Sequence, residues 1–514
     1  MLLHHRFIEI AKKNAKKIAI YDQATGKDIT YERMLLASLL LAKKFQKYKG
    51  HYLGIMVPTS AGCMLSILGA LMSGKIPVMI NYSTGARENS IYAQEKCSFK
   101  TIITSKKLLE KLNIEPVPGM IYLEDIMAGI KLTDKLGSLL KTKLPRGIIK
   151  SVVQGESEED TSIILFTSGS EKEPKAVQLT HRNISHNINN IPNIIKILDS
   201  DIFAGTLPLF HVFGLTTNFW LPLLMGCSIV AHPNPLDYKA IVESIKKYGI
   251  TVLIGTPTFF WGYLKKAQTG DLESIRYAIA GADKLTDKLR NTYIKEHHIE
   301  ILEGYGATET SPVISVNRPD ANKPGSIGKP IPGVKVKILD RETDEELPPG
   351  QEGKIVVKGD LVMKGYLGDI EETSLHIRNG WYDTGDMGVL DEDGFLWHRG
   401  RLKRFVKIAG EMVSLVKVED VLSSLLPEKV ICCVVDVPNP TKGSDIVAAV
   451  TTGEIDKKKI IRNMKKMLPP IAIPKEFYVI EDIPMMGSGK VSFREVEKIC
   501  REFQENGNEK DKIH

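Results

Sequence analysis

The sequence predicts an α/β protein with a large N-terminal domain of α/β layers, a small β-rich subdomain within it, and a small α+β C-terminal domain. The chain has 514 residues, which is more than one hydrophobic core usually organises. From about Tyr31 to Asp340, short Val/Ile-rich runs alternate with longer helical patterns. Between Pro330 and Arg401 the pattern changes to short strands and turns, and a mixed pattern of helices and strands follows.

The alternating region predicts parallel sheet, because strands that alternate with helices form β-α units whose ligand loops lie at the strand ends. Four apolar runs mark such strands: KTIITS (100–105), DTSIILFTSGS (160–170), GITVLIGTP (249–257) and SIRYAIAGAD (274–283). We place the large domain at residues 1–402, with its β-rich subdomain at about 330–400. The C-terminal domain then covers residues 403–514.

Composition excludes several classes of protein. With 43% hydrophobic and 25% charged residues, the chain has the composition of an ordinary globular protein. The net charge of +7 is spread along the chain, and no compact basic run interleaves with aromatics, so we expect no nucleic-acid partner. The six cysteines show no metal-binding spacing, which predicts a reduced, cytoplasmic protein. The longest apolar stretch, Cys63 to Asn81, is broken by glycine, lysine and proline and predicts a buried helix followed by a strand.

The strongest local signal is FTSGSEKEPKAVQLTH, residues 166–181. An apolar strand runs directly into a turn of hydroxyl side chains and a glycine, and Lys175 adds a positive charge. Such hydroxyls and closely spaced backbone N–H groups bind phosphate oxygens, although ordinary turns are also rich in serine and glycine. The phosphate-binding candidates are Thr167, Ser168, Gly169, Ser170 and Lys175.

This segment resembles the phosphate loop of the adenylate-forming superfamily, which includes acyl-CoA synthetases, luciferase and peptide-synthetase adenylation domains. The family pattern is T-S-G-S/T-T-G-x-P-K-G. The sequence departs from it at Glu171, Lys172 and Ala176. Lys172 stands where the family has glycine, so we expect it to add a phosphate contact or to stiffen the loop. Four further segments match in the same order, and the resemblance extends from about Phe7 to Lys498.

The first of these is LPLFHVFGL, residues 207–215, which resembles the family segment that lines the acyl pocket. The resemblance implies substrate contacts for Phe213 and Gly214 and a gate at His211; the alternative is a core strand with a buried histidine. The segment contains no acidic residue to pair with an ammonium group, which favours an acid without an α-amino group. Its apolar content suits a tunnel for a long fatty acid and suits core packing equally well.

The second match combines AGAD (280–283) with EGYGATETSP (303–312), which resemble the adenine site and the central family motif. The resemblance implies that Tyr305 stacks on the base, that Thr308 hydrogen-bonds the α-phosphate and that Glu309 holds Mg²⁺. It adds three nucleotide-binding positions, Gly281, Ala282 and Gly306.

The remaining matches lie nearer the C-terminus. GWYDTGD (380–386) supplies Asp386 for the ribose hydroxyls. GRLKR (400–404) supplies Arg401 for the nucleotide and Lys403 as the hinge about which the family's C-terminal domain swings. Arg404 stands where the family usually has an acid. PMMGSGKVSFREVEKI (484–499) aligns Lys490 with the family's adenylation lysine. The resemblance therefore implies Lys490, Thr308 and Glu309 as catalytic residues and a mobile C-terminal lid.

Together with the resemblance, these features predict ATP- and Mg²⁺-dependent activation of a long-chain fatty acid to acyl-AMP with pyrophosphate release. The acyl group is then expected to pass to the phosphopantetheine thiol of acyl carrier protein. The KIAGEMVSL segment (407–415) resembles bacterial synthetases that load acyl carrier protein. The basic face of KKKIIRNMKKML (457–468) suits docking of such a protein, and it also suits an ordinary solvated helix. The alternatives are a fatty acid:CoA ligase and, from another class, a non-catalytic nucleotide-binding scaffold. A peripheral contact with a membrane is compatible with the sequence.

Overall fold

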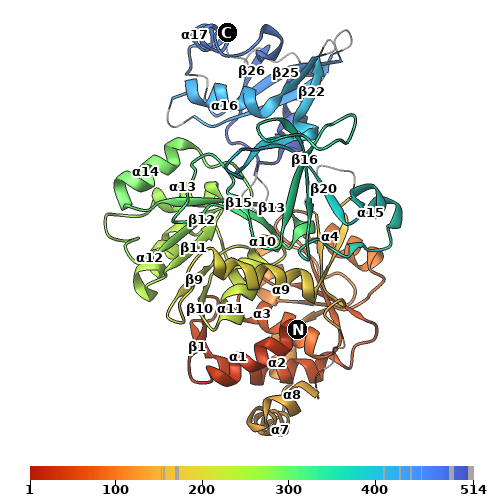
Figure 1. Ribbon diagram of the computed structural model, residues 1–514. Coiled ribbons are helices and arrows are strands. Elements are labelled where there is room, and N and C mark those ends of the chain that lie inside the picture. The colour runs from red at the N-terminus through yellow and green to blue at the C-terminus, as the bar shows by residue number, and fades with distance from the viewer. Residues whose placement is uncertain are drawn as a thin grey trace. The chain divides into compact units, whose positions relative to one another are not determined.

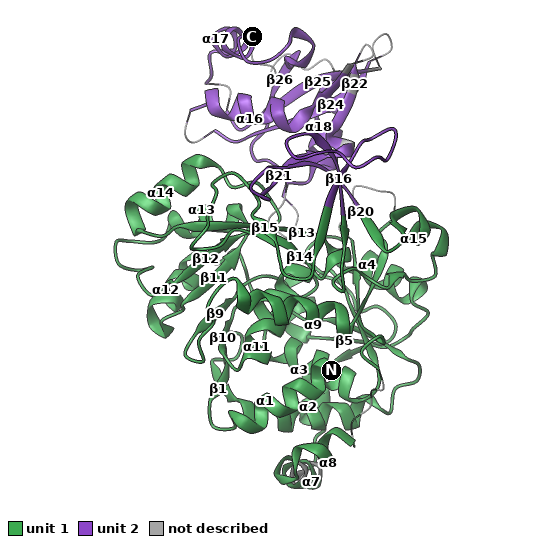
Figure 2. Ribbon diagram, viewed as in Figure 1, with its two compact units in different colours: residues 1–336, 357–382 green, residues 337–356, 383–514 purple. Residues whose placement is uncertain are grey.

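The computed structural model describes residues 1–151, 153, 155, 157–167, 173–408, 411–427, 430–439, 443–452, 454–485 and 491–506 (Figure 1). The chain divides into two compact units (Figure 2). Unit 1 comprises residues 1–336 and 357–382, and unit 2 comprises residues 337–356 and 383–514. This division differs from the domain boundary at residue 402 that the sequence suggests, and that boundary stays a prediction.

Unit 1 contains a nine-stranded sheet whose interior strands are parallel and whose edge pairs are antiparallel. Its order is β15 (Lys329–Pro330), β14 (Val313–Val316), β13 (Ile301–Gly306), β12 (Tyr277–Ala280), β11 (Val252–Gly255), β9 (Ile202–Gly205), β10 (Ser228–Ala231), β1 (Ile18–Asp22) and β2 (Lys27–Thr30). The predicted parallel pairing is therefore correct for the interior of the sheet.

A second, seven-stranded sheet of unit 1 carries the predicted phosphate loop. Its order is β18 (Gly365–Tyr366), β8 (Ala176–Thr180), β7 (Thr161–Phe166), β4 (Ile76–Met79), β3 (Tyr52–Met56), β5 (Ile102–Thr104) and β6 (Met120–Tyr122). From β7 to β6 the neighbours are parallel, whereas β8 and β18 are antiparallel to theirs. Residues 365–366, which the sequence places in a β-rich subdomain, thus complete the edge of this sheet.

Capping side chains mark where two helices of unit 1 begin. Thr30 caps α2 by accepting a hydrogen bond from the Arg33 N–H, and Thr180 forms a capping box with Asn183 at α9. The predicted buried helix is present as α3, and every one of its residues except Gly62 is buried. The main helices are α1 (Leu3–Lys13), α2 (Tyr31–Phe45), α3 (Ala61–Met72), α4 (Ala86–Lys96), α5 (Lys106–Leu112), α6 (Leu123–Ala128), α7 (Leu132–Lys143), α8 (Arg146–Ser151), α9 (His181–Asn190), α12 (Tyr238–Tyr248), α13 (Pro257–Leu264), α14 (Asp287–His297) and α15 (Ile370–His376).

Strands β16 (Lys335–Leu339), β17 (Glu352–Lys358) and β20 (Trp381–Leu390) each contribute residues to both units, and β19 (Ile377–Arg378) and β21 (Leu396–Arg401) pair with β20. Unit 2 continues with a hairpin, β22 (Phe405–Ile408) and β23 (Glu411–Ser414), and a three-stranded sheet, β24 (Cys432–Asn439), β25 (Gly443–Val450) and β26 (Glu476–Val479). Its helices are α16 (Leu415–Leu425), α17 (Lys457–Met464) and α18 (Phe493–Asn506). Val418, Val434, Ile446 and Phe477 belong to its own apolar core. Across the described ranges, the helices are too short or too polar for one to traverse a bilayer.

Candidate active site

The two ends of the predicted phosphate loop, Thr167 and Lys175, are hydrogen-bonded to each other between the end of β7 and the start of β8. The Thr167 N–H donates to the Lys175 carbonyl at 3.0 Å, and the Lys175 N–H donates to Thr167 Oγ1 at 3.1 Å. Ser168, Gly169 and Ser170 lie outside the described residues, as does Lys172. Ala176, the third departure from the family pattern, is fully buried at the start of β8, so the position that lacks a glycine is filled by a packed methyl group.

The Lys175 side chain contacts two residues of α15 that the sequence analysis did not select. Its ammonium group is hydrogen-bonded to the Glu372 carboxylate and lies 3.4 Å from His376 Nε2. The ammonium group also lies 5.2 Å from the centre of the Tyr366 ring. The hydrogen bond from Lys175 lowers the pKa of Glu372. Lys175 is therefore held at the sheet edge by a carboxylate that can be exchanged for another anion.

Glu309 lies in a short helical turn, Thr308–Thr310, directly after β13. Its side chain is 9% exposed and accepts a hydrogen bond from the Tyr366 hydroxyl at 3.0 Å. The Glu309 carbonyl accepts a second bond from the Met363 N–H at 2.8 Å. Burial, and then the nearby Glu309 charge, raise the pKa of Tyr366, so its hydroxyl remains a donor. Tyr366 thus contacts both the predicted metal ligand and the predicted phosphate lysine.

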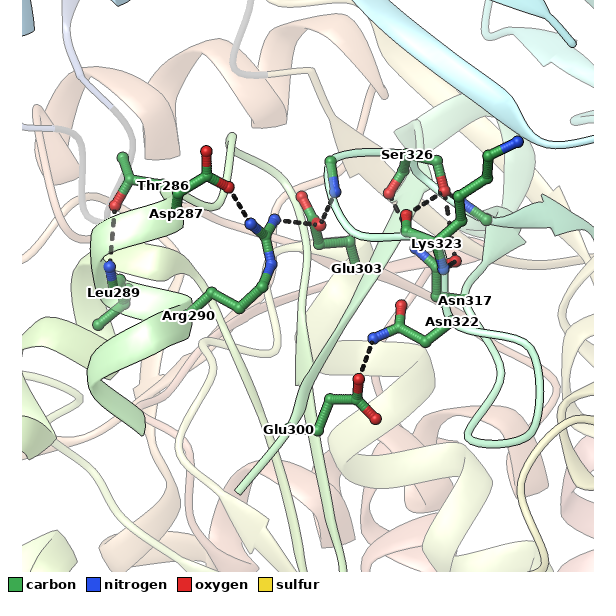
Figure 3. Close-up of polar contacts among 12 residues, drawn as sticks. Thr286, Asp287, Leu289, Arg290, Glu300, Glu303, Asn317, Asn322, Lys323 and Ser326 are labelled. Atoms are coloured by element: carbon green, nitrogen blue, oxygen red, sulfur yellow. Dashed lines mark hydrogen bonds and ion pairs between the residues drawn. The ribbon is translucent and has the colours of Figure 1, made fainter. Parts of the chain in front are cut away.

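A buried ion pair supports the first residues of the central motif (Figure 3). Glu303 in β13 accepts a hydrogen bond from Arg290 Nη2 at 2.7 Å and another from the Gly325 N–H at 2.9 Å. Arg290 also pairs with Asp287, and the Glu303 carbonyl accepts from the Asn317 N–H at 2.8 Å. Burial raises the pKa of Glu303, and these donors act in the opposite direction. The pair fixes β13, which ends with Tyr305 and Gly306.

The close approach of two chain segments explains the glycine at the end of β13. A Cβ atom at Gly306 would lie 1.9 Å from the Pro312 carbonyl oxygen, so a side chain cannot fit there. Tyr305 pairs with Ser315 across the β13–β14 hairpin and is partly exposed. Ala282, the predicted adenine contact after β12, adopts a positive φ of 72°, a conformation that is uncommon for alanine.

The predicted acyl segment is not a strand, which rules out the core-strand alternative. Residues 207–211 are irregular, and a helical segment follows: α10 (Val212–Gly214), a π-helical stretch (Leu215–Trp220) and α11 (Leu221–Met225). Helical stretches of this wide kind are frequent at functional sites. His211 immediately precedes the helix and is partly buried. A Cβ atom at Gly214 would lie 2.5 Å from the Pro208 carbonyl oxygen, so only glycine fits.

This helical segment contacts both predicted nucleotide motifs of unit 1. A Cβ atom at Gly281 would lie 3.1 Å from Cζ of Phe213, so the glycine makes room for the Phe213 ring. The Thr216 hydroxyl donates to the Ser311 carbonyl at 2.9 Å, in the central motif. The structure therefore brings the predicted acyl and adenine segments together.

The remaining predicted residues belong to unit 2. Asp386 and Arg401 face each other across β20 and β21, and Arg401 Nε lies 3.5 Å from Asp386 Oδ1. Asp386 is 4% exposed. Lys403 lies in a short turn, Leu402–Arg404, and Lys490 lies outside the described residues. Arg404, the departure from the family's acid, pairs with Glu419 at 2.9 Å.

The residues present fit a nucleotide-borne Mg²⁺ better than a metal held by protein alone. Among the described residues, no three His, Cys, Asp or Glu side chains gather as a metal-binding group. Mg²⁺ is commonly bound by one or two carboxylates together with substrate phosphates, and Glu309 can supply such a carboxylate. The hydroxyls of Thr167 and Thr308 and the Lys175 ammonium group are suitable partners for phosphate oxygens.

Comparison with solved structures defines the class of fold. ATP-bound MatB from Rhodopseudomonas palustris superposes with a TM-score of 0.85, covering 98% of this chain and 100% of that chain at 23% identity. The o-succinylbenzoate CoA synthetase from Bacillus subtilis, in complex with its acyl-adenylate intermediate, superposes with a TM-score of 0.83, covering 96% of this chain and 98% of that chain at 22% identity. The expected α/β fold, with a large N-terminal and a small C-terminal domain, is that of the adenylate-forming enzymes.

The sequence comparisons then give the family. Residues 7–367 match the AMP-binding enzyme family, and residues 417–490 match the AMP-binding enzyme C-terminal domain. The chain belongs to the AMP-binding enzyme family, which confirms the resemblance to the adenylate-forming superfamily. Two relatives are named long-chain-fatty-acid–CoA ligase. The relative from Salmonella typhimurium is 27% identical, and the match covers 93% of this chain and 91% of the relative. The relative from Bacillus subtilis is 28% identical, and the match covers 94% of this chain and 91% of the relative.

Proposed function

We propose that this protein is an AMP-forming acid–thiol ligase that activates a long-chain fatty acid with ATP and Mg²⁺ and then transfers the acyl group to a thiol. The observation that carries the proposal is the contact series of Lys175, Tyr366 and Glu309, which links a phosphate-loop cation to a buried carboxylate. Family membership and the names of the relatives support the ligase reaction and the fatty-acid substrate.

In the first step, a fatty-acid carboxylate oxygen bonds to the α-phosphorus of ATP, and the bond to pyrophosphate breaks. Two anions must meet, so catalysis depends on positive charge aimed at their meeting point. We assign Lys490 to that point and Lys175 to the departing phosphates. Mg²⁺, when bound at Glu309, supplies further charge neutralisation. No general base is needed because a fatty acid is ionised at neutral pH.

We assign the nucleotide's other contacts to residues of both units. Tyr305, Gly281 and Ala282 form the base site, Thr308 meets the α-phosphate, and Asp386 and Arg401 bind the ribose. Phe213, Gly214 and His211 line the acyl site. In the second step the thiol attacks the acyl carbonyl and AMP leaves. We propose that the C-terminal domain turns about Lys403 between the two steps, so that Lys490 vacates the space that the thiol needs.

For the acceptor thiol, the relatives' names favour coenzyme A. Acyl carrier protein is the second candidate, and the KIAGEMVSL segment favours it. In α17, Ile460 and Met464 are buried, but the helix ends at Met464, before the end of the 457–468 segment, and Met467 is 55% exposed. The basic face is therefore shorter than the sequence suggests.

The cysteines are all free thiols, which supports a cytoplasmic location.

The decisive assay measures pyrophosphate release with ATP, Mg²⁺ and a long-chain fatty acid, followed by kcat/KM for thioester formation on coenzyme A and on holo acyl carrier protein. Release that does not depend on the fatty acid would defeat the proposal and favour the nucleotide-binding scaffold. Lys490→Ala should abolish adenylation but still convert preformed acyl-AMP to thioester. Lys498→Ala, an exposed lysine of the same domain, is the matched control and should retain both steps.

A further inference from the structure

Helices α7 and α8 expose more apolar surface than their neighbours do. Both belong to unit 1 and lie at its end, next to α1 and α2 (Figure 2). Four large aliphatic side chains on these helices and on the short link between them are exposed to solvent: Leu139 (42%), Leu140 (71%), Leu144 (36%) and Ile148 (47%). Exposed apolar side chains that cluster in this way mark an interaction site more often than single ones do. We call these four residues the α7–α8 surface.

The exposure is not that of an unpacked segment. Thr142 and Ile149, which alternate with the exposed residues, are 2% and 0% exposed. Lys12 Nζ in α1 donates to the Thr142 carbonyl at 2.8 Å and to the Leu144 carbonyl at 3.2 Å, which satisfies groups at the end of α7. One face of the helical pair is thus fixed to the protein while the aliphatic face is turned outward.

The same segment is strongly basic. Between residues 131 and 150 the sequence has six lysines and arginines and one acidic residue. Lys143 pairs with Glu32 and Lys150 pairs with Glu9, both at 2.5 Å. Counting these two glutamates with the segment still leaves an excess of three positive charges. The Lys143 side chain is 65% exposed, so its ion pair is weak and its charge remains available to an anionic surface.

We propose that the α7–α8 surface docks on an anionic lipid bilayer, with the four aliphatic side chains entering the interface and the basic residues meeting the headgroups. An aliphatic face flanked by lysine and arginine is the composition of helices that lie in a membrane surface. Protein interfaces are instead enriched in aromatic residues and methionine, and none of the four exposed side chains is of these kinds. The proposal goes beyond the proposed ligase reaction and does not depend on it.

The test uses the full-length protein and large unilamellar vesicles. One set contains phosphatidylglycerol and phosphatidylcholine, and the other contains phosphatidylcholine alone. The wild type should co-sediment with the anionic vesicles and lose most of this binding at high salt. The double variant Leu140→Ser/Ile148→Ser replaces two exposed aliphatic side chains with polar ones. It should lower partitioning of the protein onto the anionic vesicles about tenfold or more. Arg146→Glu should lower it by a similar factor, because each basic charge near an anionic surface contributes about fivefold.

Leu236→Ser is the matched control, because Leu236 is 60% exposed elsewhere on unit 1 and should not affect vesicle binding. Unchanged thermal unfolding of the double variant would show that it folds. Equal binding of the wild type to both vesicle types, or an equal loss in Leu236→Ser, would overturn the proposal. Absence of vesicle binding would leave an acidic protein as the partner and would also overturn it. Failure of pyrophosphate release in solution would defeat the ligase assignment without changing the vesicle result.

Discussion

Glu309 and Lys175 are both assigned to the phosphate end of the nucleotide, but the protein holds them differently. Glu309 is buried, its carboxylate accepts a hydrogen bond from the Tyr366 hydroxyl, and its backbone carbonyl accepts one from the Met363 N–H. Lys175 is bound through its side chain to Glu372 and His376, whose own side chains are 26% and 30% exposed. The carboxylate is thus positioned by the interior, whereas the ammonium group is positioned by an ion pair that phosphate oxygens can replace.

This difference teaches that the two ends of the site should respond differently to mutation. Changes at Glu309 and its support should reduce catalysis or folding, because a buried polar group that loses its hydrogen-bond partner has little access to water. Changes around Lys175 should mainly alter the competition between Glu372 and ATP. Four variants would break or sharpen the comparison.

The largest effect is expected for Glu309→Gln. An amide lacks the charge that a magnesium ligand supplies, so kcat/KM for pyrophosphate release should fall about 1,000-fold, or about 4 kcal/mol. The control is Glu296→Gln at an exposed site of α14, which should keep wild-type kinetics. If Glu309→Gln loses less than about tenfold, Glu309 is not the metal ligand.

Arg290→Ala should lower the free energy of unfolding by about 3 kcal/mol or more, because Glu303 would remain buried without its cation. Urea denaturation measures this. Burial raises the pKa of Glu303, so the folded variant keeps a proton that the unfolded chain releases as the pH rises through the normal glutamate range. The loss should therefore be smaller at pH 4 than at pH 7. A pH-independent loss would show that lost packing, and not the buried charge, dominates.

Tyr366→Phe tests the hydroxyl that joins the two halves of the comparison. Removing one hydrogen bond to Glu309 should cost about 1 kcal/mol, or about fivefold in kcat, with the ring contact to Lys175 retained. Steady-state pyrophosphate release measures it. Tyr293→Phe, which removes another buried tyrosine hydroxyl of the same unit, is the control. Equal losses of kcat in both variants would show that the Tyr366 hydroxyl has no specific role in supporting Glu309.

The smallest effect is expected for Glu372→Gln. Partly exposed ion pairs contribute less than about 1 kcal/mol, so KM for ATP should fall about twofold while kcat stays unchanged. The fall reflects the release of Lys175 from a competing anion. A rise in KM would instead mean that Glu372 holds Lys175 in its ATP-binding position, and it would overturn the interpretation of an exchangeable contact.

Local patterns predicted several of the interior strands. The runs at 100–105, 160–170, 249–257 and 274–283 all contain strands, because a buried parallel strand is a short apolar run whatever its neighbours are. The pairing of β18 with β8 was not predictable. A two-residue strand has no periodicity, and its partner lies far away in the sequence.

Distance along the sequence also explains which residues of the candidate site could not be predicted. Thr308 and Glu309 lie in a motif and were identifiable from the sequence, although their roles stay predictions. Glu372 and His376 were not, because their importance comes from contact with Lys175, about 200 residues earlier in the chain. An acid and a histidine four residues apart on a helix are otherwise an ordinary surface pair.

The β8–β18 pairing also has a consequence for synthesis of the protein. Strand β8 ends at Thr180, and the strand that covers its outer edge is Gly365–Tyr366. A ribosome adds about 5–20 residues per second, so this edge remains uncovered for roughly 10–40 s while the intervening chain is made. Uncovered strand edges are templates for pairing with other chains. The nascent polypeptide therefore passes through an interval in which aggregation competes with folding, and fragments that stop before residue 365 keep that edge open permanently.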